Sequence, residues 1–396
     1  MNTIIRNHKH QRKINILFII DSLLSLEGGT ERHLYNLVKY LDKNRFNCSI
    51  IAFNLDEELE KNMRGEGINI YHVPVASYFT INALRRVFDL KRIIRESQID
   101  VVQTFHFKSD TFGVLASKFS GVKSIVSSRR DTGDTKKKRH IFLNKIMNPQ
   151  IYKFITVCNA VGERIESDEG VKRSKQVTIY NGVDLNRFIV PDRGHILALR
   201  KKLGINKEDF VVGKVAYFRP EKSYDIFFKA MLLVKESIKD LKVLTVGRGP
   251  TLLQCQKYCE ENNLEDRVIY VGRADDIRDY VAVMDVACLV PGSNEGFSNA
   301  VLEKMAMGKP LIVTNIGGNA EAVINGENGI IIPPLDHKSL AEAIIYLYNN
   351  PSKREEMGRK SRKRVERYFS LERMIKNHEY FYEDIMNRYS GKINHV

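Results

Sequence analysis

The chain has 396 residues, of which 43% are hydrophobic and 28% are charged, as in a soluble globular enzyme of two or three domains. No apolar run approaches the roughly 20 residues of a membrane-spanning helix, and the N-terminal stretch lacks the apolar region and cleavage site of a signal peptide. We therefore expect a cytoplasmic protein.

The net charge of +15 is unevenly distributed. Residues 1–190 contain 31 Lys and Arg against 20 Asp and Glu, whereas the rest of the chain contains 32 against 28. Basic clusters at residues 85–86, 91–95 and 136–139 indicate an anionic partner, either acidic lipid head groups or nucleic acid. A nucleic-acid reader would show a recognisable module or interleaved aromatic residues, and neither is found. We therefore predict contact of the basic N-terminal half with an anionic membrane and no nucleic-acid partner.

The five cysteines are scattered along the chain. Cys255 and Cys259 share one helix face, but no second pair or histidine cluster accompanies them. Structural thiols are therefore expected, and no metal site.

The first half of the chain alternates β-branched runs with amphipathic stretches, which is typical of βαβ units and implies a parallel sheet covered on both faces. Strands are predicted at 14–20, 48–53, 68–73, 100–105, 123–128, 153–158 and 176–180, and helices at 30–41, 81–96, 109–119, 138–148 and 160–167.

After a polar connection near residue 190 the alternation restarts, and beyond residue 335 the pattern is helical to about 390. The fold class predicted is α/β, with two doubly wound Rossmann-like domains facing an interdomain cleft. The expected divisions are a basic tail (1–13), an N-terminal domain (14–190), a C-terminal domain (191–369) and a final helix (370–396). Strands of the second half are predicted at 210–217, 242–247, 267–272, 286–290 and 310–314, with helices from residues 224, 250, 276 and 298.

The loop after strand 286–290 carries the carboxylate of Glu295. Ser298 is a candidate helix N-cap, and the backbone N–H groups of residues 296–299 would form an anion site at the helix N-terminus. Glu303, set among apolar residues, could face the same cleft and accept hydrogen bonds from two vicinal hydroxyls. The alternative is that Glu295 caps the helix and Glu303 is a solvated surface residue.

Two further loops after predicted strands carry groups that suit phosphate. Gly28 and Gly29 precede the first helix, and paired glycines let the backbone approach a phosphate closely. Arg219 and Lys222 open another helix, where cations work against the helix dipole unless an anionic ligand offsets the cost. The alternatives are an ordinary turn and simple surface charge.

Two more such loops contain Gly317, Gly318 and Glu321, and His106. A single histidine is more often structural, but at a cleft it would suit proton exchange with a hydroxyl. Because all five loops follow strands, where doubly wound sheets bind their ligands, together they predict a site for a nucleotide diphosphate that carries a sugar.

Several of these segments resemble, in order, the family 4 glycosyltransferases of the group 1 type, which are retaining enzymes that use a nucleotide sugar. The resemblance covers residues 14–385, is most specific from 289 to 334, and implies the glycosyltransferase-B fold with the last helix crossing back onto the N-terminal domain. The segments are GGTERHLYNL (28–37), IYNGVDLNRF (179–188), FRPEKSYDIFFKA (218–230), the E-x7-E pair of Glu295 and Glu303, and GGNAEAV with NGENGIIIPP (317–334).

The resemblance implies roles for individual residues. Glu303 would bind the ribose hydroxyls, Glu295 would lie near the donor sugar, and Lys222 would bind the diphosphate. Arg219 would assist, although the arginine of the family lies five positions before the lysine, where this chain has Tyr217. The implied donor-binding residues are Gly28, Gly29, Arg219, Lys222, Glu295, Gly296, Phe297, Ser298, Asn299 and Glu303, and the implied catalytic residues are Glu295, His106, Lys222 and Arg219.

The chain contains no Asp-x-Asp, so a metal-clamped diphosphate is not expected; helix dipoles and cations would stabilise the leaving group, without a cofactor beyond the nucleotide-diphosphate sugar. The implied chemistry is same-face attack by an acceptor hydroxyl. The implied acceptor is a glycan or lipid-linked molecule of bacterial cell-surface polysaccharide or glycolipid synthesis, reached from the cytoplasmic face of the plasma membrane. One alternative is a nucleotide-sugar epimerase of the same fold, which the GGTERH segment and the E-x7-E pair disfavour. The other is a non-catalytic nucleotide-sugar- or nucleic-acid-binding protein, which the presence of Lys222, Glu295 and Glu303 disfavours.

Overall fold

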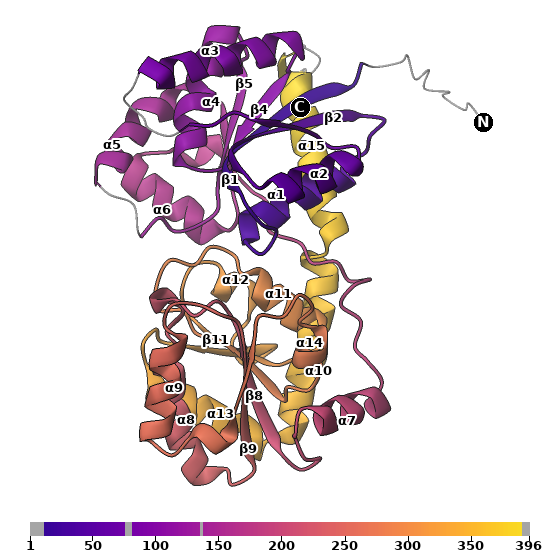
Figure 1. Ribbon diagram of the computed structural model, residues 1–396, viewed down its shortest axis with the longest axis vertical. Coiled ribbons are helices and arrows are strands. Elements are labelled where there is room, and N and C mark those ends of the chain that lie inside the picture. Colours follow the sequence, from indigo (N-terminus) through magenta and orange to yellow (C-terminus); the bar gives the residue numbers. More distant parts are fainter. Residues whose placement is uncertain (1–11, 76–80, 135–137, 390–396) are drawn as a thin grey trace, which may run out of the picture.

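The computed structural model describes residues 12–75, 81–134 and 138–389. They form two domains along the long axis of the molecule, each with one parallel β-sheet between layers of helices (Figure 1). The predicted α/β class with two doubly wound domains is therefore confirmed. Most of the predicted basic tail, and residues 136–137 of the third basic cluster, lie outside the described residues. No helix within the described ranges is long and apolar enough to cross a membrane.

Within the described residues, the N-terminal sheet has seven parallel strands in the order β3-β2-β1-β4-β5-β6-β7. The central strand β1 (Ile14–Leu23) pairs on both sides, and residues 16–20 are completely buried, which explains their continuous apolar run. The other elements are β2 (Phe46–Leu55), β3 (Asn69–His72), β4 (Val101–Thr104), β5 (Ser124–Arg129), β6 (Lys153–Thr156), β7 (Gln176–Thr178), α1 (Gly29–Tyr40), α2 (Glu57–Gly65), α3 (Ile81–Glu96), α4 (Phe107–Ser120), α5 (Lys138–Met147), α6 (Asn159–Glu169), η1 (Asn148–Gln150) and η2 (Arg173–Lys175).

Helix α2 has no counterpart in the prediction. Met63 is its one buried side chain, so the segment carries no apolar periodicity that could indicate a helix. The helix begins after Asp56, whose side chain accepts a hydrogen bond from the backbone N–H of Leu59 at 2.9 Å. Capping therefore identifies this helix where burial does not.

The C-terminal sheet, as far as the structure describes it, has six parallel strands in the order β10-β9-β8-β11-β12-β13. Strand β13 was not predicted, although it lies within the segment NGENGIIIPP. The elements are β8 (Phe210–Val215), β9 (Leu241–Val246), β10 (Val268–Gly272), β11 (Val286–Leu289), β12 (Leu311–Thr314), β13 (Gly329–Ile332), α7 (Arg193–Lys202), η3 (Pro220–Lys222), α8 (Tyr224–Ser237), α9 (Leu252–Glu261), η4 (Glu265–Arg267), α10 (Arg278–Ala282), α11 (Asn299–Ala306), α12 (Asn319–Ala322), α13 (His337–Asn349), α14 (Pro351–Tyr368) and α15 (Leu371–Tyr389).

The described chain crosses between the domains twice, and the two crossings lie side by side. The N–H of Val183 donates to the carbonyl of Phe369 at 3.0 Å, and the N–H of Leu371 donates to the carbonyl of Val183 at 2.9 Å. Gly182 permits this approach, because a Cβ there would lie 2.6 Å from the carbonyl oxygen of Ser370. The second crossing leads into α15, which runs back along the N-terminal domain (Figure 1).

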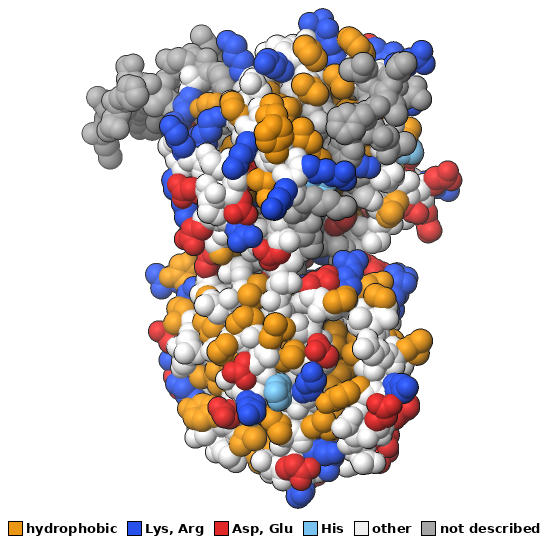
Figure 2. Space-filling model, turned by 90° about the vertical axis from the view of Figure 1, so that its left-hand side faces the viewer, with side chains coloured by type: hydrophobic (Ala, Val, Ile, Leu, Met, Phe, Trp, Pro, Cys, Tyr) orange, Lys and Arg blue, Asp and Glu red, His pale blue; other side chains and the backbone are white. Residues whose placement is uncertain are grey.

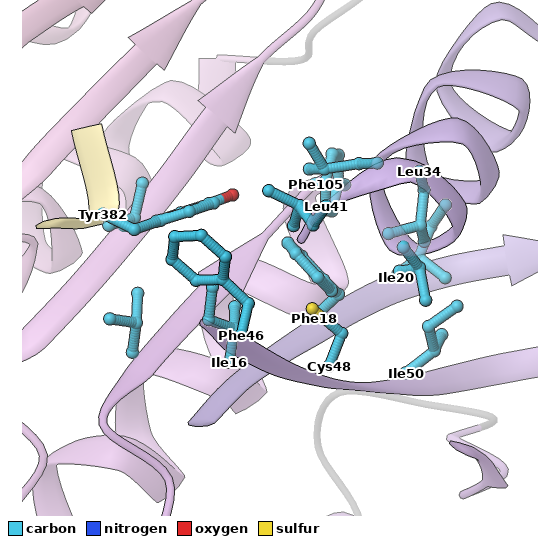
Figure 3. Close-up of a cluster of buried hydrophobic side chains, with 14 of the residues drawn as sticks. Ile16, Phe18, Ile20, Leu34, Leu41, Phe46, Cys48, Ile50, Phe105 and Tyr382 are labelled. Atoms are coloured by element: carbon cyan, nitrogen blue, oxygen red, sulfur yellow. The ribbon is translucent and has the colours of Figure 1, made fainter. Parts of the chain in front are cut away.

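Helix α15 completes the core of the N-terminal domain. The ring of Tyr382 lies 6.5 Å from that of Phe18 on β1 and 6.1 Å from that of Phe46 on β2, measured between centroids (Figure 3). The hydroxyl of Tyr382 donates to Oε1 of Gln103 on β4 at 2.7 Å, and both groups are buried. The N-terminal domain therefore depends for its core on the last described helix.

The five cysteines are all buried and free of disulfides, as expected for structural thiols. Cys255 and Cys259 lie on α9, and burial raises the pKa of Cys255 to about 11. Among the described residues, no group of three or more His, Cys, Asp or Glu side chains is arranged to hold a metal ion.

Candidate active site

A cation and a carboxylate from two loops of the C-terminal domain form an ion pair. Lys222 ends the turn η3 after β8, and Glu295 lies in the loop after β11, the strand adjacent to β8 in the sheet. The Nζ atom of Lys222 donates to Oε2 of Glu295 at 2.7 Å, with the two side chains 22% and 12% exposed. Glu295 is therefore engaged by a cation from the neighbouring loop, rather than by the helix that it precedes.

The N-terminus of α11 presents backbone donors next to this pair. Ser298 occupies the N-cap position, as predicted, but its side chain makes no capping hydrogen bond. In the part of the chain that the structure describes, the N–H groups of residues 296–299 have no hydrogen-bond acceptor. Gly296 is required, because a Cβ there would lie 2.0 Å from the carbonyl oxygen of Arg130. Free N–H groups with a helix dipole behind them favour an anion.

Glu303 lies further along α11 and lines an interdomain pocket of about 270 Å³. Arg32 of α1, Arg187 and Asn299 line the same pocket. Burial raises the pKa of the Glu303 carboxyl, while the charges of Lys304, Arg32 and Arg187 act in the opposite direction. Glu303 is therefore a half-buried carboxyl between the two domains, rather than a fully solvated surface residue.

The glycine loop before α1 meets the N-terminus of α11 across the domains. A Cβ on Gly29 would lie 3.6 Å from Nδ2 of Asn299. A Cβ on Gly28 would lie 2.0 Å from Oε2 of Glu31, whose side chain folds back over the loop. Two predicted donor-binding residues, Gly29 and Asn299, are thus brought together from different domains.

Arg219 stands apart from the ion pair. Its guanidinium carbon lies 4.6 Å from the ring centroid of Tyr217, and its side chain is 58% exposed. Tyr217, which occupies the position of the arginine typical of the family, therefore supports Arg219 on its ring. The contribution of Arg219 to diphosphate binding stays a prediction.

His106 lies on the N-terminal side of the cleft, at the start of α4. Asp21 of β1 accepts hydrogen bonds there from the backbone N–H groups of Lys108 at 3.0 Å and Ser109 at 2.6 Å. Burial raises the pKa of Asp21, and the nearby His106 lowers it. The two side chains lie close together at the carboxyl edge of the N-terminal sheet. Asp21 was not among the predicted site residues, and the role of His106 stays a prediction.

Two residues without a predicted role connect the donor loop to the N-terminal domain. Nη2 of Arg130 donates to Oδ1 of Asn181 at 2.5 Å, and Nδ2 of Asn181 donates to the carbonyl oxygen of Phe297 at 2.7 Å. Phe297 itself is buried. Asn181 belongs to the segment IYNGVDLNRF, so the resemblance marked the segment, but no pattern in the sequence marked its amide as a bridge.

Glu321 of α12 caps a helix of the other domain. Its carboxylate accepts hydrogen bonds from the backbone N–H groups of Asn159 at 3.0 Å and Ala160 at 2.9 Å, which open α6. The hydroxyl of Tyr180 donates to the same carboxylate at 2.8 Å. This glutamate, placed by sequence in a ligand-binding loop, instead joins the two domains.

Each domain matches a family model of its own, and several known proteins are similar to both domains. Residues 27–187 match Glycosyltransferase Family 4, and residues 196–364 match Glycosyl transferases group 1. The N-acetyl-alpha-D-glucosaminyl L-malate synthase of Bacillus anthracis is 28% identical over 58% of this chain and 59% of that enzyme. The UDP-Gal:alpha-D-GlcNAc-diphosphoundecaprenol alpha-1,3-galactosyltransferase of Escherichia coli is 26% identical over 84% of this chain and 87% of that enzyme.

A solved structure, Anabaena Alr3699/HepE in complex with UDP, superposes with a TM-score of 0.84 at 21% identity, covering 94% of this chain and 100% of that chain. At this identity the likeness establishes the shared fold. The two family matches divide at the connection between the domains and together span most of the chain. The chain therefore belongs to the group 1 glycosyltransferases, with an N-terminal domain of the glycosyltransferase family 4 type.

Proposed function

We propose that this protein is a retaining glycosyltransferase that moves a sugar from a nucleotide-diphosphate sugar to a hydroxyl of a glycan or lipid-linked acceptor. The observation that carries the proposal is the Lys222–Glu295 ion pair beside the free N-terminus of α11. The UDP named in the HepE complex and the diphosphoundecaprenol-linked acceptor named for the E. coli enzyme support the two substrate classes.

In this proposal the donor lies along the N-terminus of α11. The ribose hydroxyls donate to Glu303, and the diphosphate accepts hydrogen bonds from the free N–H groups of residues 296–299. Lys222 turns from Glu295 toward the phosphates, because a diphosphate offers it more negative charge than one carboxylate. Glu295 is then released to accept hydrogen bonds from the donor sugar.

The acceptor hydroxyl attacks the anomeric carbon from the face that the diphosphate leaves. The bond between the anomeric carbon and the phosphate oxygen breaks, the new glycosidic bond forms, and the departing phosphate oxygen takes the hydroxyl proton. Lys222 and the dipole of α11 stabilise the charge that develops on the leaving group. No cofactor beyond the nucleotide sugar enters this proposal. His106 and Asp21 face the acceptor side.

The acceptor side is also proposed to rest on an anionic membrane. Phe88 of α3 and Phe142 of α5 are 62% and 64% exposed, a degree unusual for large apolar side chains. Figure 2 shows apolar side chains interspersed with Lys and Arg on the upper, N-terminal domain. Apolar anchors within a basic surface are typical of peripheral membrane proteins. The other exposed members of this surface are Phe119, Ile146, Arg85, Arg92, Lys118, Arg139 and Lys145.

A panel of nucleotide sugars tests the function. UDP-glucose, UDP-galactose, UDP-N-acetylglucosamine and GDP-mannose are screened by thermal shift with and without EDTA, and we expect at least one to raise the melting temperature without metal. The product of the active donor is examined by NMR for the configuration at the anomeric carbon. Absence of a shift with every nucleotide would overturn the donor assignment, and an inverted product would overturn the retaining mechanism.

A further inference from the structure

A lysine is buried directly beneath the loop that carries Lys222. Lys214 belongs to the otherwise apolar strand β8, FVVGKV, and its side chain has no exposed surface. Burying an ammonium group is costly unless it is fully hydrogen-bonded, so a lysine in a central strand calls for a reason. A methionine would fill similar space without that cost.

The contacts of Lys214 show what the ammonium does. Its Nζ donates to the carbonyl oxygen of Lys222 at 2.5 Å and to that of Ser223 at 3.2 Å. The same atom lies 4.2 Å from the ring centroid of Tyr224 and 5.2 Å from that of Phe227. Ser223 has a φ of 48°, a left-handed conformation that a non-glycine residue adopts at a cost. The ammonium therefore holds the backbone of a strained turn.

We propose that Lys214 is a positioning residue of the donor site, which fixes the turn that carries Lys222 and supplies buried positive charge behind the diphosphate. The inference rests on the proposed nucleotide-sugar function. Lys214 does not touch the donor; it acts through the carbonyl groups of residues 222 and 223. The diphosphate would thus lie in front of two ammonium groups, one at the surface and one in the core.

The charge state of Lys214 supports this role. Burial lowers the pKa of Lys214 to about 7, and the charge of Lys222 lowers it further, while the carboxylate of Asp225 acts in the opposite direction. A diphosphate bound nearby favours the charged ammonium and so raises this pKa. Binding therefore takes up a proton above pH 7, and affinity falls as the pH rises. UDP-glucose is a suitable probe because it lacks the terminal phosphate that titrates near pH 6.

Lys309 provides a matched control. Its Nζ also donates to two carbonyl oxygens, those of Ala282 at 2.7 Å and Met284 at 2.8 Å, and burial lowers its pKa to about 8. Lys309 precedes β12, however, so it lies at the opposite edge of the sheet from the donor loops. Lys309 is half-buried, and a Lys309→Met variant therefore removes an ammonium with similar hydrogen bonds without touching the donor site.

The test measures the dissociation constants of UDP-glucose and of uridine for the full-length wild type, Lys214→Met, Lys214→Gln and Lys309→Met between pH 6 and 9. Glutamine keeps a hydrogen-bond donor but removes the charge. We expect both Lys214 variants to weaken UDP-glucose binding about tenfold or more at pH 6.5, to leave uridine within about twofold, and to lose the pH dependence. The Lys309 variant should match the wild type in all three respects.

The outcomes distinguish the positioning role of Lys214 from a general effect of buried charge and from failure of the proposed function. If Lys214→Gln or Lys214→Met is folded and keeps the wild-type ratio of UDP-glucose to uridine affinity, the positioning role is wrong. If Lys309→Met weakens UDP-glucose equally, the effect is a general loss of buried charge and the assignment fails. If the wild type binds none of the nucleotides, the proposed function fails first, and the inference falls with it.

Discussion

The Nζ atom of Lys222 donates to Oε2 of Glu295 at 2.7 Å, which closes an ion pair across two adjacent strand ends of the C-terminal sheet. Both partners were assigned from sequence to the donor, and in the structure they bind each other. On the proposed function, donor binding exchanges one partner for another. On the proposed function, the pair orients the lysine before the donor arrives, and it competes with the diphosphate for the same cation.

This competition predicts opposite effects for the two partners. Glu295→Gln should tighten UDP binding about fivefold, because a partly buried ion pair of about 1 kcal/mol no longer has to be broken, while turnover falls. Lys222→Met should weaken UDP binding at least about tenfold. Isothermal titration of UDP with each variant and the double variant measures both effects. Weaker UDP binding by Glu295→Gln would rule out the competition.

The carboxylate of Glu303 should lower the stability of the fold while it strengthens the binding of UDP. Because its folded pKa is raised, the stability that this group contributes is present below its usual pKa near 4.5 and is lost as the pH rises through the folded value. Glu303→Gln should therefore melt higher than the wild type at pH 8, with a smaller difference at pH 5, and bind UDP at least about tenfold more weakly. Thermal unfolding across pH measures the first effect and titration the second. Full transferase activity of Glu303→Ala would contradict the ribose assignment.

Glu321 should hold the domains together. Replacing it by Gln removes a charge from the N-terminus of α6 and should cost about 1–2 kcal/mol, as for other charged helix caps. Urea unfolding measures this loss, and small-angle scattering should show a larger radius of gyration as the domains separate. The control is Tyr180→Phe, which removes the hydrogen bonds of the Tyr180 hydroxyl with Glu321 and Asn159 but keeps the cap. Equal effects of both variants would assign the contact to the tyrosine.

Tyr382 should be more important for stability than its distance from the cleft suggests. Tyr382→Phe leaves Oε1 of Gln103 without its buried donor, which should cost about 1–3 kcal/mol, and Tyr382→Ala should cost about 3–5 kcal/mol through the cavity between β1 and α15. Denaturant unfolding at constant slope measures both. The exposed Tyr380, at 74%, gives the matched Tyr380→Phe control, which should change stability by less than about 0.5 kcal/mol.

Membrane contact predicts binding to vesicles that contain acidic lipids. Lys145→Glu should weaken this binding at least about fivefold per charge removed, and raising the salt concentration from 50 to 500 mM should weaken it steeply. Phe142→Ser should also weaken it, whereas Leu253→Ser should not, because Leu253 is equally apolar and 79% exposed but lies on the other domain. Sedimentation with vesicles measures the bound fraction. Binding that is independent of salt would remove the electrostatic account.

The fold could be predicted from the sequence because a parallel strand that is buried on both faces consists of consecutive apolar residues. Residues 16–20 of β1 are apolar because both faces of the sheet are covered, so the strand appears directly in the sequence. Helix α2 gave no such signal because it buries one side chain, Met63. Strand β13 was hidden in a glycine-rich segment.

The candidate site could be predicted only in part, because contacts between residues of different domains leave no pattern in the local sequence. Glu295, Glu303 and Lys222 were selected as candidates because each follows a strand or belongs to a family motif. The contacts that these residues make could not be predicted, because no pattern in the sequence indicates that Glu295 binds Lys222. The bridge from Arg130 through Asn181 depends on two segments that meet only in the folded chain.

The return of α15 has a consequence for how the protein is made. The buried bond from Tyr382 to Gln103 joins residues 279 positions apart. At about 5–20 residues per second, a ribosome needs on the order of tens of seconds to synthesise the intervening chain. During that time the apolar sheet face that includes Phe18 and Phe46 has been synthesised, but helix α15, which covers it, has not. The N-terminal domain is therefore translated before the C-terminal domain, but its core is completed only after the C-terminal domain has been synthesised, so its apolar strands stay accessible to chaperones during that time.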